Sequence, residues 1–167
     1  MKETRLQSLV DYVIAYCNVF GFTITPLKLQ KILYYVQAWH IVKHERHQLF
    51  NELPQAWVNG PVYRSVYNTY KDRFYRSSPL MMRRVREEGD IVLEELKNNL
   101  DVSDIQLETI NIILKHYSSM DEGKLVLLTH NDSPWNEARE GLGEFDRCQK
   151  NISIDSMYSF YSNNKKE

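Results

Sequence analysis

The chain has 167 residues, a mass of 19.9 kDa and a formal net charge of −1, from 21 basic and 22 acidic side chains. A near-neutral charge disfavours a protein that coats nucleic acid or an anionic membrane by bulk electrostatics. The hydrophobic fraction of 43% excludes wholesale disorder, and the length fits one domain with its own core. No apolar run reaches the roughly 18 residues that span a bilayer, and the N-terminus does not resemble a secretory signal.

Residue usage also bounds the fold and the compartment. Six glycines and five prolines are few for an all-β fold with its many turns. Cys17 and Cys148 lie far apart without a CxxC pattern, which predicts reduced structural thiols in a cytoplasmic protein. The 11 tyrosines, six phenylalanines and three tryptophans can fill a core, and Tyr and Trp are also enriched at protein–protein interfaces.

Two helices are predicted at the start of the chain. The first runs from a capping box at Thr4 and Gln7 to a closing Gly21, with apolar residues at helical spacing between them. The second begins at Thr25–Pro26, an N-cap followed by a first-turn proline, and reaches about His44. Its apolar residues cover more than one face, so we expect it to be the most buried helix, contacted on several sides.

A connection with a short extended piece at Gln55–Val58 follows this helix over residues 45–60. Gly60 and Pro61 are then predicted to start a third helix that ends near Phe74. Aromatic residues lie at helical spacing along this third segment, while its opposite side is polar.

The segment 75–102 has little periodicity. Residues 77–79 form a break, residues 83–90 are predicted to be a solvated charged loop, and residues 91–100 a short helix or, as the alternative, a strand. Starting signals predict four further helices. These signals are Ser103 with Gln106, Asp121, Ser133 with Pro134, and the apolar spacing from Ile154.

The predicted elements define a mainly α fold. We expect a single compact multi-helix domain over residues 1–162, with at most a small β element near residues 55–58. Residues 163–167 are expected to be a disordered tail. Neither an internal repeat nor a low-complexity linker divides the chain.

The histidines are the first candidates for a metal or catalytic site. His40, His44 and His47 would share one face of a continuing helix at a spacing that zinc sites use, but no carboxylate or cysteine is placed to complete a site. We therefore expect no metal site. His40 is expected to lie in the core, and His44 and His47 are expected to be solvated. His130 with Asp132 suggests acid–base work, yet no nucleophile or catalytic motif accompanies the pair. The sequence predicts neither an enzyme nor a cofactor.

The sequence also argues against a nucleic-acid partner. The first two predicted helices are joined by a short turn, as in a helix–turn–helix, but the second is too apolar to read base edges. The arginines at 83–86 are followed at once by acidic residues that cancel most of their field. We therefore expect no nucleic-acid and no membrane partner.

Three blocks, in order along the chain, resemble motifs of the SocA-like Panacea domain family. They are ITPLKLQKILYYVQAWH (Ile24–His40), QAWVNGPVYRSVYNTYK (Gln55–Lys71) and LVLLTHNDSPWNEAR (Leu125–Arg139). The resemblance implies a compact helical domain and an antitoxin that neutralises a cognate bacterial or phage toxin encoded by an adjacent gene, usually by binding it. An alternative is an adaptor that delivers its partner to an ATP-dependent protease, as one family member does. An alternative of another class is a phage-associated enzyme with an unrecognised site.

The motif residues that core packing does not explain are divided between two roles. Buried polar groups need partners, so one set is expected to be a structural network, whereas exposed Trp, Tyr and Arg side chains dominate binding energy at interfaces. The structural set is Gln30, Tyr34, Gln37, Trp39, Gly60, Pro61, His130 and Trp135. The expected toxin-contact set is Lys31, Trp57, Asn59, Tyr63, Tyr67 and Arg139. Lys31 and Arg139 are expected at the surface or in ion pairs, because unpaired charges are rarely buried. The alternative is that the whole set is a buried network.

Overall fold

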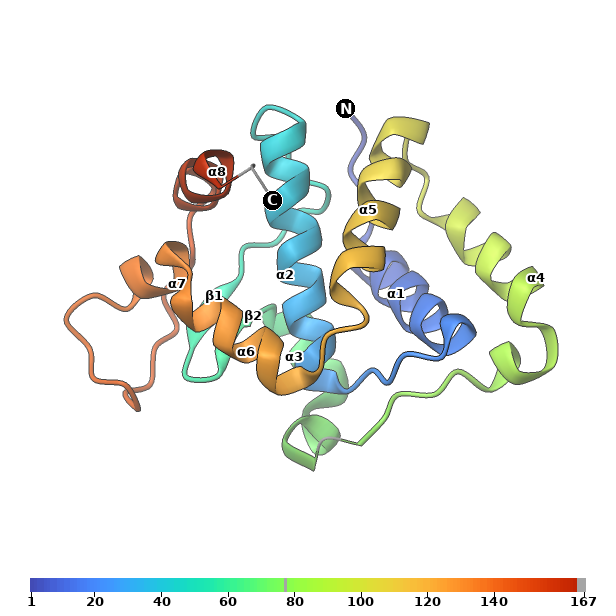
Figure 1. Cartoon of the computed structure of the whole chain (residues 1–167), viewed down its shortest axis with the longest axis horizontal. Helices are drawn as coiled ribbons and strands as arrows, with labels where there is room; N and C mark the ends of the chain where they lie inside the picture. Colours follow the sequence, from blue (N-terminus) through green and yellow to red (C-terminus); the bar gives the residue numbers. More distant parts are fainter. Residues whose placement is uncertain (77, 165–167) are drawn as a thin grey trace.

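Helix α2 (Pro26–Lys43) is the centre of the fold in a computed structural model that describes residues 1–76 and 78–164 (Figure 1). All of its residues except Leu27, Trp39 and Lys43 are buried. Helices α1, α5, α6 and α8 and a β-hairpin pack around it. The expectation of a central helix contacted on several sides is confirmed. Thr25 caps its start by accepting a hydrogen bond from the Lys28 amide.

The remaining elements are mostly helical, which confirms the predicted fold class. In chain order they are α1 (Leu6–Phe20), β1 (Gln55–Trp57), β2 (Gly60–Val62), α3 (Arg64–Tyr70), the 3₁₀-helix η1 (Lys71–Arg76), α4 (Arg83–Asn99), α5 (Asp104–Tyr117), α6 (Glu122–Asn131), α7 (Ser133–Ala138) and α8 (Ile154–Asn163). Among the described residues, no helix combines the length and the apolar character needed to cross a bilayer. Part of the predicted break, Ser77, and most of the predicted tail, residues 165–167, lie outside the described residues.

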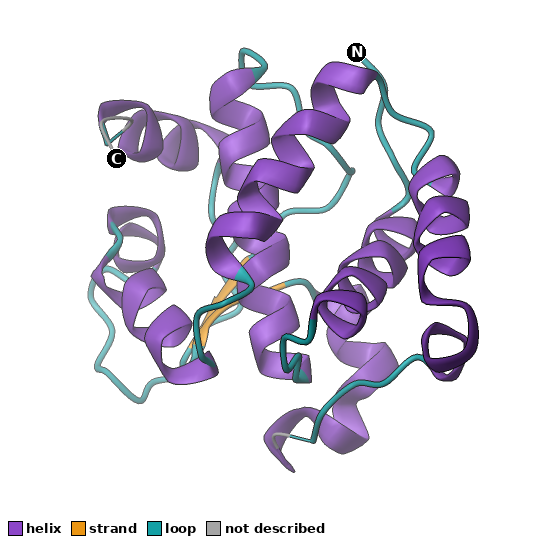
Figure 2. Cartoon of the chain, turned by 45° about the vertical axis from the view of Figure 1, so that its right-hand side comes forward, coloured by secondary structure: helices purple, strands orange, loops and turns teal. Residues whose placement is uncertain are grey.

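The two short strands form an antiparallel hairpin beside α2, drawn in orange in Figure 2. Trp57 pairs with Gly60, so the tip consists of residues 58 and 59. The small β element is confirmed, but the prediction that Gly60 and Pro61 start a helix is wrong: both belong to β2, and α3 begins at Arg64. Gly60 has a φ of 106°, a left-handed value that is incompatible with a right-handed helix.

Helix α4 corrects the expectation of a charged loop at residues 83–90. The helix begins at Arg83 and bends at Glu88, whose φ and ψ are −144° and 45°. The bend brings Arg84 and Glu95 into an ion pair at 2.8 Å, whereas residues 11 apart on a straight helix lie about 16 Å from each other. Val92 is its one fully buried residue, and Leu93 and Leu96 pack partly buried against the core. The first turns of the helix carry mostly charged side chains, which is why the sequence favoured a loop there.

Some of the capping residues predicted at helix starts are confirmed and one is not. The capping box of Ser103 with Gln106 is present, and Asp121 caps α6. The box predicted at Thr4 is absent: the Thr4 amide donates to the Leu49 carbonyl, and α1 begins after Arg5 without a side-chain cap.

Candidate partner-binding site: a hairpin held by buried polar side chains

Two glutamine amides of α2 bind the main chain of the segment that includes the hairpin. Gln30 accepts from the Tyr63 amide at 2.8 Å and donates to the Tyr63 carbonyl at 3.2 Å. Gln37 accepts from the Leu49 amide at 2.7 Å and donates to the Phe50 carbonyl at 2.8 Å. Each amide therefore supplies the donor–acceptor pair that a neighbouring strand would supply, and fixes the chain at two points on α2.

Lys31, the residue after Gln30 in α2, extends its side chain to the hairpin. Its side chain is 0% exposed, and Nζ donates to the Pro61 carbonyl at 2.9 Å. Burial lowers the pKa of Lys31 to about 7, although the charge of Glu122 acts in the opposite direction. The lysine passes so close to Gly60 that a Cβ there would lie 2.6 Å from Lys31 Cε and 2.8 Å from Thr129 Oγ1. A residue without a side chain is therefore required at position 60.

Arg139 is a second buried cation that binds the hairpin. It follows α7 and is 5% exposed. Its Nη1 donates to the Ala56 carbonyl at 2.9 Å, and its Nη2 donates to the carbonyls of Gly143 at 3.1 Å, Glu144 at 3.4 Å and Asp146 at 2.7 Å. The guanidinium therefore joins strand β1 to the loop that follows α7.

Trp135 of α7 supplies another donor to the hairpin. Its Nε1 donates to the Trp57 carbonyl at 2.8 Å, and the His130 ring stacks on it at 4.2 Å between centroids. Burial lowers the pKa of His130, and the neighbouring charge of Lys31 lowers it further. The Nε2 atom of His130 is buried without a hydrogen-bond partner among the described residues, which agrees with a neutral ring.

The expectation that Lys31 and Arg139 lie at the surface or in ion pairs is wrong. Both are buried, and the acceptors that the structure gives their charged groups are main-chain carbonyls. Tyr63, also expected to contact the toxin, is 0% exposed and packs edge-to-face on Phe50. These three side chains support the hairpin from inside and do not reach a partner in this conformation.

The other three expected contact residues are accessible. Asn59 is exposed at the hairpin tip, and Trp57 and Tyr67 are half-buried with their rings edge-to-face at 4.8 Å. The sequence interpretation missed Arg64, whose exposed guanidinium lies 5.6 Å from the Trp57 ring centroid. Its position in the second block was the available signal. We call Trp57, Asn59, Arg64 and Tyr67 the hairpin surface.

Tyr34 and Trp39 lie elsewhere, in an aromatic cluster that attaches α8 to α2. The Tyr161 hydroxyl of α8 donates to Asp132 Oδ2 at 2.7 Å and lies 3.1 Å from the Tyr34 hydroxyl. Trp39 Nε1 donates to the Tyr117 hydroxyl at 2.9 Å. Burial raises the pKa of Asp132, against the opposing effect of the tyrosine hydroxyls that donate to it.

His40 in α2 and His44, which caps its C-terminal end, both use a ring nitrogen for hydrogen bonds within the fold. His40 Nδ1 lies 2.8 Å from the His47 carbonyl and must donate to it, so Nε2 accepts from Gln106 at 3.0 Å. His44, expected to be solvated, is buried against Thr109, with 3.0 Å between Nε2 and the hydroxyl. Burial lowers the pKa of His40 to about 4. The part of the chain that the structure describes contains no group of three or more His, Cys, Asp or Glu side chains suited to a metal.

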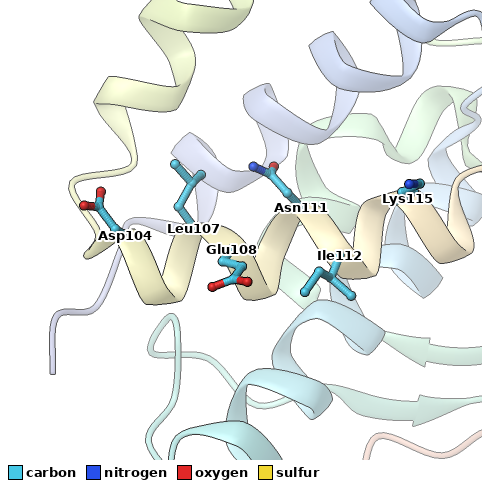
Figure 3. A pocket seen from close by; sticks show the side chains of 6 residues that line it. All are labelled: Asp104, Leu107, Glu108, Asn111, Ile112 and Lys115. Atoms are coloured by element: carbon cyan, nitrogen blue, oxygen red, sulfur yellow. The ribbon is translucent and has the colours of Figure 1, made fainter.

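A shallow groove on α5 is separate from this site. Asp104, Leu107, Glu108, Asn111, Ile112 and Lys115 line it, and they follow one another along the helix in Figure 3. None of the motif residues is among them.

The fold and the site define a small helical domain in which several buried polar side chains bind the backbone of one β-hairpin. Residues 29–136 match the model of the family described as Antitoxin SocA-like, Panacea domain. The match covers more than half of the chain, which therefore belongs to this family, and the resemblance found in the three blocks is confirmed. No curated protein and no solved structure matches the chain significantly.

Proposed function

We propose that this protein is a cytoplasmic antitoxin-like protein that neutralises a cognate bacterial or phage toxin by direct contact rather than by catalysis. Membership of the antitoxin SocA-like family supports an antitoxin-like role with a protein partner. The observation that carries the choice of surface is the convergence of Lys31, Trp135 and Arg139 on the hairpin carbonyls.

The chemistry of this convergence favours a positional role. An isolated two-stranded hairpin is at best marginally stable in water. Buried charged groups are costly to desolvate, and apolar replacements of similar volume are often as stabilising. Apolar side chains in place of Lys31 and Arg139 could stabilise the fold as well, but they could not bind particular carbonyl groups. The role that we assign to Lys31 and Arg139 is therefore to fix the position of the hairpin. A surface ordered in advance loses little conformational entropy when it binds.

The hairpin surface has the residue types that dominate binding energy. Trp57 and Tyr67 provide two packed aromatic rings, and Arg64 adds a guanidinium near the Trp57 ring; interface hot spots are enriched in these residue types. Asn59 adds an exposed amide at the tip that can both donate and accept.

The test is neutralisation in cells. The chain is expressed together with the protein encoded by the reading frame next to its own gene, and growth is measured for Asn59→Ala and Arg64→Ala, at two exposed positions of the hairpin surface. Ile105→Ala, at a 66% exposed position on α5, is the matched control. We expect the two hairpin variants to lose protection while their melting temperatures stay unchanged, and the control to protect. If both hairpin variants protect like the unaltered protein, this surface is not the contact.

The adaptor alternative is separated by the fate of the partner. Sequestration leaves the toxin level constant when its growth inhibition disappears. A toxin level that falls only in cells with an active ATP-dependent protease identifies delivery for degradation. An immunoblot of the toxin in protease-deficient and normal cells distinguishes the two.

A further inference from the structure

The loop between α7 and α8 carries an aromatic residue on a closed turn. Phe145 is 80% exposed, the highest exposure among the large hydrophobic residues that the structure describes. Gly143 and Asp146 close the turn around it, with the Asp146 amide donating to the Gly143 carbonyl at 3.1 Å and the Gly143 amide donating to Asp146 Oδ2 at 2.7 Å. The ring is therefore presented on a defined four-residue turn.

Buried Arg139 holds this turn in place. Its Nη2 donates to the carbonyls at both ends of the turn, Gly143 and Asp146, while Nη1 donates to Ala56 in the hairpin. One buried guanidinium thus orders the turn and the hairpin together. Scattered surface hydrophobics are ordinary, but an aromatic ring on a turn fixed by a buried charge has the rigid support that binding anchors need.

Charge around the ring is acidic. Glu140, Glu144 and Asp146 are exposed, and Arg147 is the one basic side chain in residues 140–147, so this segment carries a formal charge of −2. An apolar ring inside an acidic rim is complementary to an apolar pocket with a basic rim. The turn also lies outside residues 29–136, which match the family model. Its sequence is therefore a feature of this chain that the family pattern does not specify.

We propose that Phe145 is an anchor that inserts into an apolar pocket of the protein partner, and that lysine or arginine side chains around that pocket face Glu140 and Glu144. This inference rests on the proposed function, because the partner is the toxin. The hairpin surface and the Phe145 turn are then two parts of one interface, joined from inside by Arg139. The turn supplies the apolar contact and the negative charge, and the hairpin surface supplies Arg64 from α3 and the amide of Asn59 from the hairpin tip.

The experiment measures affinity between the purified chain and the purified protein of the adjacent reading frame. Phe145→Ala is expected to weaken binding at least about tenfold, and Phe145→Tyr, which keeps the ring, to restore most of it. Glu144→Lys is expected to slow association and to reduce its dependence on salt. Ile105→Ala, at a similarly exposed position far along the chain, is the control and should bind within about twofold of the unaltered protein.

Each outcome decides between the two proposals. Unchanged binding by Phe145→Ala, with tight binding by the unaltered chain, overturns the anchor and leaves the proposed function in place. A failure of the unaltered chain to bind or to protect cells overturns both. If the unaltered chain dimerises and Phe145→Ala is monomeric in light scattering while toxin binding is unchanged, the pocket belongs to a second copy of this chain and the proposed partner is wrong. Because the Phe145 ring is exposed, melting temperatures should be the same for all variants.

Discussion

Replacing Lys31 with methionine tests whether a buried ammonium supports the hairpin. Lys31 is 0% exposed, and its pKa is lowered from 10.5 to about 7 by desolvation. A folded-state pKa below the unfolded one means that the folded protein binds the proton more weakly. The destabilising effect of the buried charge is therefore fully present below pH 7 and is relieved as the pH rises from 7 towards 10.5.

The size of the effect follows from the shift. A fall of this size corresponds to about 5 kcal/mol between the two protonation states. Between pH 7 and pH 9, the free energy of unfolding of the unaltered protein should rise by about 2 kcal/mol relative to Lys31→Met. Cys17 and Lys28, whose pKa values are also shifted by burial, titrate in both proteins, so the difference isolates Lys31.

Urea unfolding followed by tryptophan fluorescence at pH 7, 8 and 9 measures this difference, provided that the denaturant dependence is the same for both proteins. At pH 7 the variant also loses the donor to the Pro61 carbonyl, a cost of about 1–3 kcal/mol. This loss does not change with pH. If the difference in the free energy of unfolding between the two proteins stays constant from pH 7 to 9, burial does not lower the pKa of Lys31 and the reasoning is refuted.

Other predictions concern packing and metal. Gly60→Ala should destabilise the fold by about 2–4 kcal/mol, since strain and a clash with Lys31 add, whereas Gly141→Ala, at a φ of 85° in open space, should cost about 1 kcal/mol in urea unfolding. Equal losses of stability in the two glycine variants would show that the clash with Lys31 does not contribute. Leu33→Ala should cost about 2–5 kcal/mol through a core cavity in the same assay, and a loss below 1 kcal/mol would contradict its burial. A chelator should leave the melting temperature unchanged, and a shift of several degrees would indicate a metal.

Much of the helical fold could be predicted because its helices face the core with regular apolar stripes. Helix α2 and the caps at Thr25 and Ser103 follow from local pattern alone. Helix α4 could not be recognised in full, because its core-facing residues Val92, Leu93 and Leu96 lie in its second half and the charged run at residues 83–90 resembles a solvated loop. The strands of the hairpin have three residues each, too few for a clear alternation.

The candidate site was predicted as a set of residues but not as a geometry. The sequence favours the surface or an ion pair for Lys31 because charges usually lie there, yet α2 is contacted on several sides and buries both Lys28 and Lys31 while Lys43 at its end stays exposed. The acceptor that makes burial tolerable, the Pro61 carbonyl, comes from 30 residues further along the chain. Gly60 is visible in the sequence, but the reason for a glycine there is not: only the structure shows that Lys31 occupies the space that a Cβ would need.

Arg139 and Lys31 both hold the hairpin, but the structure gives them different reach, and this difference can be measured. Lys31 donates to the hairpin alone, at Pro61, whereas Arg139 donates to Ala56 and also to the turn at residues 143–146. Lys31→Met should therefore speed amide exchange in residues 55–62 and leave the turn protected. Arg139→Met should speed exchange at least about tenfold in both segments, since the hydrogen bonds that the guanidinium donates to each are lost together. Hydrogen exchange read by mass spectrometry separates the two peptides. If Arg139→Met loosens the hairpin while the turn keeps its protection, the turn is ordered by its own Gly143 and Asp146 contacts, and the hairpin and the Phe145 turn are not mechanically joined.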